Sequence, residues 1–264
     1  MSLKNIHIKR CDRDNIFKVV KPTFIDIWYP QLQKETIETK FIPITENECK
    51  TLIYYGEFRF LIKDKNFSDI KFIKKITNIL SKKIQPILEY FNNKAFFRLV
   101  GRSAKDSHGF YLKAGLVENI EDIFKQFIDS ERLIEDIFLC LKFDYPQKIV
   151  LRKWVEIKKH EEFRLIIINK EIKGISQYYY FQNKYFPELV NNIKYYQESI
   201  FSYFDKIKDL FELEDYVLDI IYYKDSPKVL EINPLCDWTD PCLFDWKKDD
   251  FADFEFRYIK NKKY

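Results

Sequence analysis

Glycine is scarce in this chain, and its positions limit the kinds of nucleotide site that the chain can form. Only five of the 264 residues are glycine, no three of them have the GxGxxG spacing, and no pair has the GxxxxGK spacing. Both motifs need glycine because the backbone amides must come close to phosphate groups. The sequence therefore excludes a Rossmann fingerprint and a Walker A loop, so any nucleotide site must be built from side chains.

Composition predicts a packed protein without an obvious nucleic-acid or membrane partner. Hydrophobic residues make up 46% of the chain, enough to fill the core of one large domain or two small ones. The 45 Lys and Arg residues exceed the 41 Asp and Glu residues by only four, and no run of five like charges occurs. The five cysteines include no CxxC pair, and we find no secretory signal or membrane-spanning apolar run. We therefore expect a cytoplasmic protein.

Hydrophobic periodicity predicts an α+β chain. We expect a short helix that opens with a capping box at 44–48, a helix at 69–91 that Pro86 kinks or splits into a pair, and helices at 120–128 and 187–207. We expect strands at 58–62, 96–101, 149–155, 163–169, 175–180, 216–222 and 229–233. The strands between 149 and 180 are expected to form an antiparallel meander.

The strongest local signal is Glu231-Ile232-Asn233 at the end of a predicted strand. Side chains two positions apart on a strand share a face, so Glu231 and Asn233 point the same way and Ile232 points into the core. An antiparallel neighbour strand could place Asp219 beside them. Two carboxylates and an amide oxygen suit a Mg²⁺ ion that bridges phosphates. The same three residues also fit an ordinary solvent-facing strand edge, and the residues alone leave both interpretations open.

A strand-like segment at 151–164 is unusually rich in charge. Its side chains alternate between two faces as in a strand, and because charged residues occur on both faces, the segment either lines a polar cleft or lies at a sheet edge. His160-Glu161-Glu162 begins like the HExxH helix of metalloproteases, but position 164 is Arg, so the motif is absent. The three His residues have no local Ser or Cys partner, and we assign no catalytic residue.

A second charged segment, at 98–107, is a predicted strand that continues into a loop and carries Arg98, Arg102 and Lys105. Cations on a loop after a strand can neutralise phosphates without glycine. A basic loop is also common on protein surfaces with no ligand, so this signal is weak by itself.

Taken together, the segments resemble the cell division cycle protein 123 family, a relative of the ATP-grasp proteins. The resemblance rests on LRKWVEIKKHEEFR (151–164), GISQYYY (174–180), YVLDI (216–220), VLEINPLCDWTDPCLFDW (229–246), TFIDIWYP (23–30) and FFRLVGRSAKDS (96–107). It implies an α+β ATP-grasp fold with the nucleotide between two α+β lobes. We expect residues 1–145 to contain the first lobe, and 146–264 the second lobe with the adenine hinge, the metal site and a short tail.

The resemblance also implies a role for each residue of a nucleotide site. It implies an adenine hinge of Lys153, Trp154 and Val155, further cleft residues Glu162 and Arg164, a metal set of Asp219, Glu231 and Asn233, and phosphate-loop residues Arg102, Lys105 and Ser107, with Arg98 where the family usually has lysine. The implied cofactors are ATP or ADP and Mg²⁺.

The function that the resemblance implies is assembly of eukaryotic translation initiation factor 2 through binding of its gamma subunit, from the same cell or from a host. The alternative is an ATP-grasp ligase that joins a carboxylate to an amine or thiol through an acyl phosphate, so enzymatic activity stays an open question. Val100-Gly101 replaces the family's usual Asn-Trp, which makes the loop closer to that of short bacterial or viral homologues. This departure, together with the short chain, weakens the assignment of the partner and leaves the nucleotide site unaffected.

Overall fold

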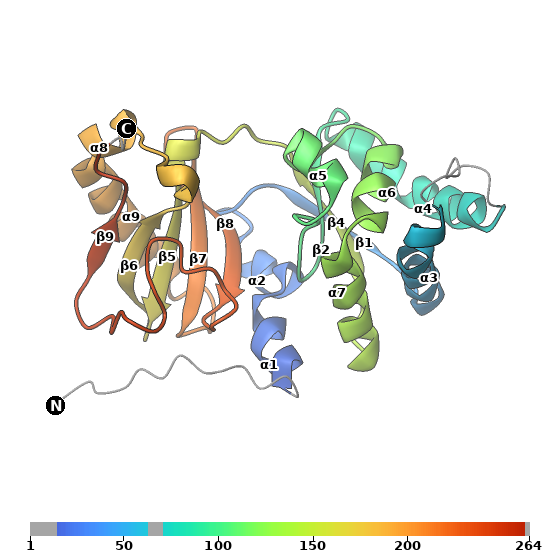
Figure 1. Cartoon of the computed structure of the whole chain (residues 1–264), viewed down its shortest axis with the longest axis horizontal. Coiled ribbons are helices and arrows are strands. Elements are labelled where there is room, and N and C mark those ends of the chain that lie inside the picture. The colour runs from blue at the N-terminus through green and yellow to red at the C-terminus, as the bar shows by residue number, and fades with distance from the viewer. Residues whose placement is uncertain (1–14, 63–70, 262–264) are drawn as a thin grey trace. The chain divides into compact units, whose positions relative to one another are not determined.

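The computed structural model describes residues 15–62 and 71–261 and divides the chain into two compact units (Figure 1). One unit is Glu38–Trp154, and the other combines residues up to Ile37 with Val155–Tyr264. The chain thus passes from one unit to the other at 154–155, whereas the sequence placed a boundary at 145–146. The last strand before the crossing, β4 (Lys148–Lys153), stays in the first unit because it pairs with strands there.

The unit Glu38–Trp154 contains an antiparallel four-stranded sheet in the order β1-β4-β2-β3. The other strands of this sheet are β1 (Thr39–Pro43), β2 (Ala95–Leu99) and β3 (Leu116–Val117). The helices of the unit are α3 (Glu46–Ile62), α4 (Lys71–Tyr90), α5 (His108–Lys113), α6 (Ile120–Ile128) and α7 (Glu131–Lys142). Phe97, Leu99 and Leu151 of the sheet belong to one buried apolar cluster with side chains of α3, α4, α6 and α7.

The predicted capping box is present, but the helix that it opens is long. Thr45 N donates to Glu48 Oε2 at 2.7 Å, and Glu48 N donates to Thr45 Oγ1 at 3.2 Å. Helix α3 continues to Ile62, so the strand predicted at 58–62 is wrong. The buried residues Cys49, Leu52 and Ile53 already follow a helical spacing, which outweighs the β-propensity of the aromatic run after them.

Helix α4 is a single helix with Pro86 inside it, so the predicted split into two helices is wrong. Positions 69 and 70 of the prediction lie outside the described residues. Leu80, Ile84 and Leu88 are fully buried at a four-residue spacing, whereas Pro86 is exposed. The proline ring therefore lies on the solvent side, where it does not interrupt the packed face.

The second unit contains a five-stranded sheet in the order β8-β7-β5-β6-β9, which Figure 1 shows side by side. The elements are α1 (Ile16–Val20), α2 (Ile25–Leu32), β5 (Glu162–Ile168), β6 (Glu171–Gln177), α8 (Pro187–Asn191), α9 (Ile193–Ile207), β7 (Tyr216–Tyr223), β8 (Ser226–Pro234) and β9 (Glu255–Arg257). All pairs are antiparallel except β6 with β9. The predicted meander is therefore only the β5–β6 hairpin, because β4 pairs with β1 and β2 instead.

Apolar groups cover both faces of this sheet. Tyr196 of α9 packs on Phe163 of β5, with ring centroids 5.1 Å apart. On the other side, Ile166 and Ile168 of β5 cluster with Phe244 and Phe251 from the segment after β8. A long C-terminal segment therefore completes the core of this unit.

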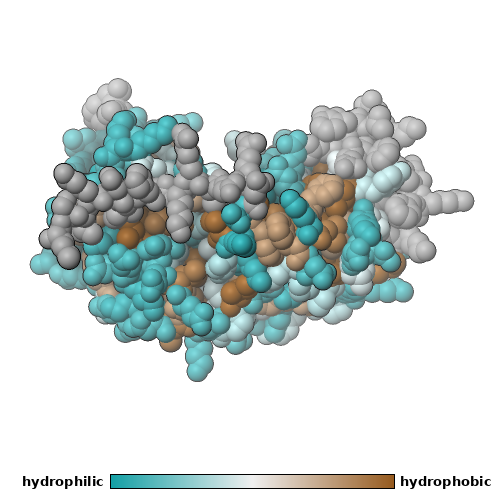
Figure 2. Space-filling view, turned by 90° about the horizontal axis from the view of Figure 1, so that it is seen from below, coloured by the Kyte–Doolittle hydropathy of each residue, from teal (hydrophilic) through white to brown (hydrophobic). Residues whose placement is uncertain are grey.

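No helix in the described ranges is long and apolar enough to cross a membrane. The face of the molecule in Figure 2 carries hydrophilic residues interspersed with apolar ones.

Candidate functional site

Five of the predicted site residues lie together on the five-stranded sheet. Arg164 of β5 is opposite Asp219 of β7, and Asp219 is opposite Glu231 of β8. Directly opposed residues of antiparallel strands project from the same face. Glu162 and Asn233 are two positions from Arg164 and Glu231, so they share that face. The register therefore brings Asp219 beside Glu231, as the sequence predicted.

Arg164 and Asp219 form a buried, two-pronged ion pair. Arg164 Nε donates to Asp219 Oδ1 and Nη2 donates to Oδ2, each at 2.7 Å. Asn233 Nδ2 also donates to Oδ2, at 3.2 Å. Burial opposes the charge of Arg164, but Asp219 outweighs this effect and raises the pKa of Arg164 well above its ordinary value. Arg164 thus supplies part of the positive charge that the sequence argument assigned to a metal ion.

The donor atoms on this face still fit a hard cation. A carboxylate oxygen has two lone pairs, so Asp219 Oδ1 can accept from Arg164 and also bind a metal, whereas Oδ2 accepts from both Arg164 and Asn233. Glu231 offers a second carboxylate, and Asn233 keeps its amide oxygen as a third donor. Among residues 15–62 and 71–261 no group of three His, Cys, Asp or Glu side chains is placed to hold a metal. An ion here would therefore need oxygens from its ligand or from water.

Arg164 also bonds the segment after β8, a contact that the sequence did not reveal. Its Nη1 donates to the backbone oxygen of Asp240 at 2.5 Å, and its guanidinium lies 5.1 Å from the centre of the Tyr178 ring. The Asp240 carboxylate accepts from Tyr180 Oη at 2.9 Å and from the backbone N–H of Cys242 at 2.8 Å. Asp240 lies 76 positions from Arg164 and 60 from Tyr180 along the chain, so no local pattern could identify these two contacts.

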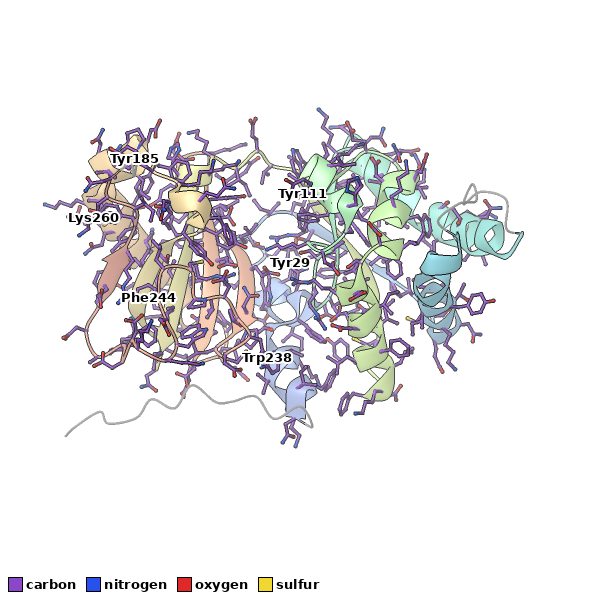
Figure 3. The ribbon with its side chains drawn as sticks, viewed as in Figure 1. Tyr29, Tyr111, Tyr185, Trp238, Phe244 and Lys260 are labelled. Atoms are coloured by element: carbon purple, nitrogen blue, oxygen red, sulfur yellow. The ribbon has the colours of Figure 1, made fainter. Side chains whose placement is uncertain are left out.

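The segment at 234–246 is fixed by its own hydrogen bonds and carries an exposed tryptophan. Thr239 Oγ1 donates to Pro234 O at 2.6 Å, and Trp246 Nε1 donates to Thr239 O at 2.7 Å. Figure 3 labels Phe244 and Trp238 on this segment. Phe244 is buried, whereas Trp238 keeps 46% of its surface exposed. The segment therefore presents Trp238 on a fixed backbone.

Four predicted phosphate-loop residues lie in the unit Glu38–Trp154, where two of them shape the loop. Arg98 donates through Nε to Leu99 O at 3.0 Å and through Nη2 to Gly101 O at 2.8 Å. Ser107 caps α5 by accepting from Phe110 N at 3.0 Å. Arg102 pairs with Glu135 at 3.1 Å, and Lys105 is exposed. The last two side chains are thus the more accessible cations of the loop.

The predicted adenine hinge is the segment where the chain leaves β4. Lys153 N donates to Glu38 O at 2.8 Å, and Trp154 N donates to Lys94 O at 3.2 Å. The Lys153 side chain is exposed, and Trp154 and Val155 are half-buried. Backbone bonds therefore fix the first two positions of the hinge within their unit.

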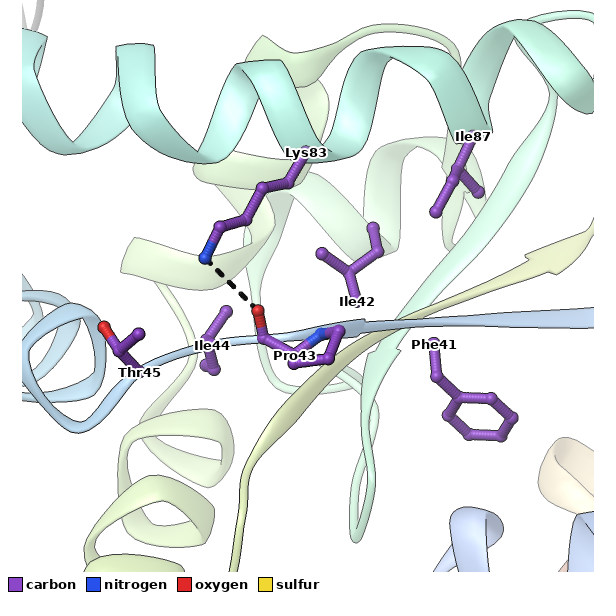
Figure 4. Close-up of a pocket in the computed structure, with 7 residues that line it drawn as sticks. All are labelled: Phe41, Ile42, Pro43, Ile44, Thr45, Lys83 and Ile87. Atoms are coloured by element: carbon purple, nitrogen blue, oxygen red, sulfur yellow. Dashed lines mark hydrogen bonds between the residues drawn. The ribbon is translucent and has the colours of Figure 1, made fainter.

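A groove of about 520 Å³ lies elsewhere in the unit Glu38–Trp154, beside β1 and α4 (Figure 4). Its walls are mostly apolar, with Lys83 at one side donating to Pro43 O at 3.3 Å. Lys83 also pairs with Glu48 at 2.7 Å, which satisfies its charge within the protein. The groove includes none of the predicted site residues and does not support a nucleotide site.

Two curated relatives match different shares of the chain, one over most of its length and one over less than half. A Xenopus laevis protein named "Translation initiation factor eIF2 assembly protein" is 28% identical over 255 residues, covering 84% of this chain and 74% of the relative. A Vanderwaltozyma polyspora protein of the same name is 34% identical over 126 residues, covering 43% of this chain and 34% of the relative.

A solved structure shares the fold. The structure of Cdc123 from Schizosaccharomyces pombe matches with a TM-score of 0.71 at 19% identity, covering 95% of this chain and 99% of that chain. The predicted α+β fold is confirmed, because the chain shares the fold of this structure and forms two compact units of helices and strands. The model of the D123 family matches residues 62–264, which is well over half of the chain. The chain therefore belongs to the D123 family, the cell division cycle protein 123 family that its sequence segments resemble.

Proposed function

We propose that this protein binds ATP or ADP with Mg²⁺ and promotes assembly of eukaryotic translation initiation factor 2 by binding its gamma subunit. The observation that carries the nucleotide part is the row of Arg164, Asp219 and Glu231 on one sheet face of a D123-family chain. The names of the curated relatives support the assembly part. A fold alone does not choose between functions, so each part needs its own test.

In this proposal the sheet face binds the charged end of the nucleotide. Asp219, Glu231 and Asn233 would hold Mg²⁺, which offsets the negative charge that carboxylates and phosphate oxygens bring together. Arg164 would balance the negative charge of Asp219 and also part of the negative charge of the phosphates. The proposal further assigns the adenine to Lys153, Trp154 and Val155, the phosphates to Arg102, Lys105 and Ser107 with Arg98 supporting their loop, and a contact along the nucleotide to Glu162.

Glu231→Ala is expected to abolish the thermal stabilisation that ATP·Mg gives the wild-type protein. At a ligand concentration of 100 Kd this stabilisation is about 2.7 kcal/mol, which shifts Tm by several degrees. Glu171→Ala is the matched control, because Glu171 is an exposed carboxylate of the same sheet paired with Lys173. Calorimetry with and without EDTA measures how far the affinity for nucleotide depends on the metal. Equal nucleotide affinity in both conditions would remove the metal role from Asp219 and Glu231.

The segment at 234–246 is the proposed contact for the gamma subunit. Aromatic residues are enriched at the energetic centres of protein interfaces, and Trp238 is exposed on a backbone that Thr239 and Trp246 fix. Arg164 links this segment to Asp219 through the backbone oxygen of Asp240. We therefore expect ATP·Mg to strengthen binding of the gamma subunit.

Trp238→Ala is expected to weaken binding of the purified gamma subunit by about 30-fold or more, the effect of losing an aromatic hot spot. The affinity for nucleotide should stay at the wild-type value. Tyr111→Ala serves as the control, because Tyr111 is an aromatic residue of the other unit with 83% of its surface exposed. Steady ATP turnover stimulated by an amine or amino acid, with no gamma-subunit binding, would instead support the ligase alternative.

A further inference from the structure

The loop between β2 and α5, residues 100–107, is attached to the start of α7 by Asp106. Asp106 Oδ1 accepts from Ser130 Oγ at 2.5 Å, and Oδ2 accepts from the backbone N–H of Arg132 at 3.0 Å. Ser130 is the N-cap residue of α7 and also accepts from Leu133 N at 3.2 Å. A negative charge at a helix N-terminus is favoured by the helix dipole. Asp106 therefore serves α7 as a second cap that comes from the loop.

Two further carboxylates bind the backbone near the ends of the same loop. Asp136 Oδ2 accepts from Gly101 N at 3.2 Å, and Asp129 Oδ2 accepts from His108 N at 2.9 Å. Asp136 is 1% exposed, and its burial raises the pKa of its carboxyl group, with Arg102 acting in the opposite direction. The loop is therefore tied to helices α6 and α7 at its beginning, near its end and at Asp106.

These bonds limit how the loop can bind an anion. The backbone N–H groups of Gly101 and His108 already donate to carboxylates, and Ser107 N donates to Ala104 O at 2.9 Å. These three backbone N–H groups are therefore already used, which gives the side chains of the loop a larger share in recognising a phosphate. Side chains on a fixed backbone bind more tightly than the same side chains on a mobile one, because less conformational entropy is lost.

We propose that Asp106 is a positioning residue that holds the loop so that Lys105, the exposed cation next to it, is presented to the phosphates of a nucleotide. This inference rests on the proposed nucleotide binding. In it Asp106 does not touch the ligand and acts through its two hydrogen bonds to Ser130 and Arg132. Loss of those bonds should therefore affect the part of the affinity that comes from phosphate and spare the part that comes from the base.

The test compares the affinities for ATP·Mg and for adenosine by calorimetry. Asp106→Ala is expected to weaken ATP·Mg binding about ten-fold while adenosine binding stays within about two-fold. Asp106→Asn keeps an oxygen that accepts from Arg132 N, and its N–H₂ group can donate to Ser130 Oγ, so this variant is expected to restore most of the ATP·Mg affinity. Asn119→Ala is the matched control, because Asn119 caps α6 by accepting from Asp122 N at 2.9 Å. It should lower Tm without changing the ratio of the two affinities.

An Asp106→Ala protein with the wild-type ratio of affinities would overturn the proposal and leave Asp106 as a helix cap only. If that variant does not fold, Ser130→Gly removes one of the two bonds of Asp106, because glycine is a good N-cap residue and lacks the hydroxyl donor, and the ratio of affinities should change in the same direction by a smaller factor. An unchanged ratio in Ser130→Gly would then overturn the proposal. Wild-type protein that binds neither ATP nor adenosine would instead contradict the proposed function itself.

Discussion

Asp219→Ala is expected to lower the free energy of unfolding by about 3–5 kcal/mol, in addition to removing nucleotide binding. Asp219 is 1% exposed and Arg164 is 6% exposed, and two hydrogen bonds of 2.7 Å join them. Without the carboxylate, the Arg164 charge stays buried with only the backbone oxygen of Asp240 and the ring of Tyr178 as partners among the contacts described above. A metal ligand on a solvent-facing strand edge would give no such loss.

Chemical denaturation measures this effect. Asp209→Ala is the matched control, because Asp209 pairs with Lys170 at 3.2 Å in the same unit while 74% of its side chain is exposed. An exposed pair of this kind contributes at most about 1 kcal/mol. An Asp219→Ala protein as stable as the wild type would show that the ion pair with Arg164 does not form in the folded protein.

Local patterns in the sequence correctly predict a helix or strand when the residues within that segment are enough to fix its structure. The helix predicted at 120–128 is α6, with the same bounds, because its apolar residues follow a helical period and Asn119 caps it. The face shared by Glu231 and Asn233 follows from the two-residue period of β8, which also points Ile232 into the core. Each of these patterns lies within about ten consecutive residues, so it can be recognised in a single sequence.

Partners that are distant in the chain could not be predicted in the same way. The two-residue period of β4 says which side chains share a face, but it does not say that β1 and β2 are its neighbours. The pairing of Arg164 with Asp219 joins positions 55 residues apart and depends on the register of β5 and β7. Asp106 contacts Ser130 only because α7, which the sequence analysis did not predict, begins beside the loop.

In the candidate site, too, local residues are predictable from the sequence and contacts between distant residues are not. Residue types and spacing identified Asp219, Glu231 and Asn233 as a set of oxygen donors, and the sheet register brings them together. The sequence alone assigns the balancing positive charge to a metal ion, because it does not reveal that Arg164 lies opposite Asp219. Positive charge from the protein lowers the cost of holding these carboxylates together before any ligand binds. Arg164 therefore has a structural role as well as its proposed role toward phosphate.

Ile232→Ala is expected to lower the free energy of unfolding by about 2–5 kcal/mol while the stabilisation by ATP·Mg persists. Ile232 is 2% exposed and lies opposite Leu218, which is fully buried. Alanine at this position removes buried methyl and methylene groups and leaves a cavity. The neighbouring side chains Glu231 and Asn233 point to the other face of the sheet, so the oxygen donors should keep their positions.

Comparison of Ile232→Ala with Glu231→Ala separates the core from the site within one strand. Thermal unfolding with and without ATP·Mg gives both quantities for each variant: Ile232→Ala should lower Tm and keep the ligand-induced shift, and Glu231→Ala should do the reverse. Ile232→Val, which removes one methyl group, should cost only about 0.5–1.5 kcal/mol. Loss of the ligand-induced shift in Ile232→Val, at nearly wild-type stability, would contradict the assignment of the two faces of β8 to core and site.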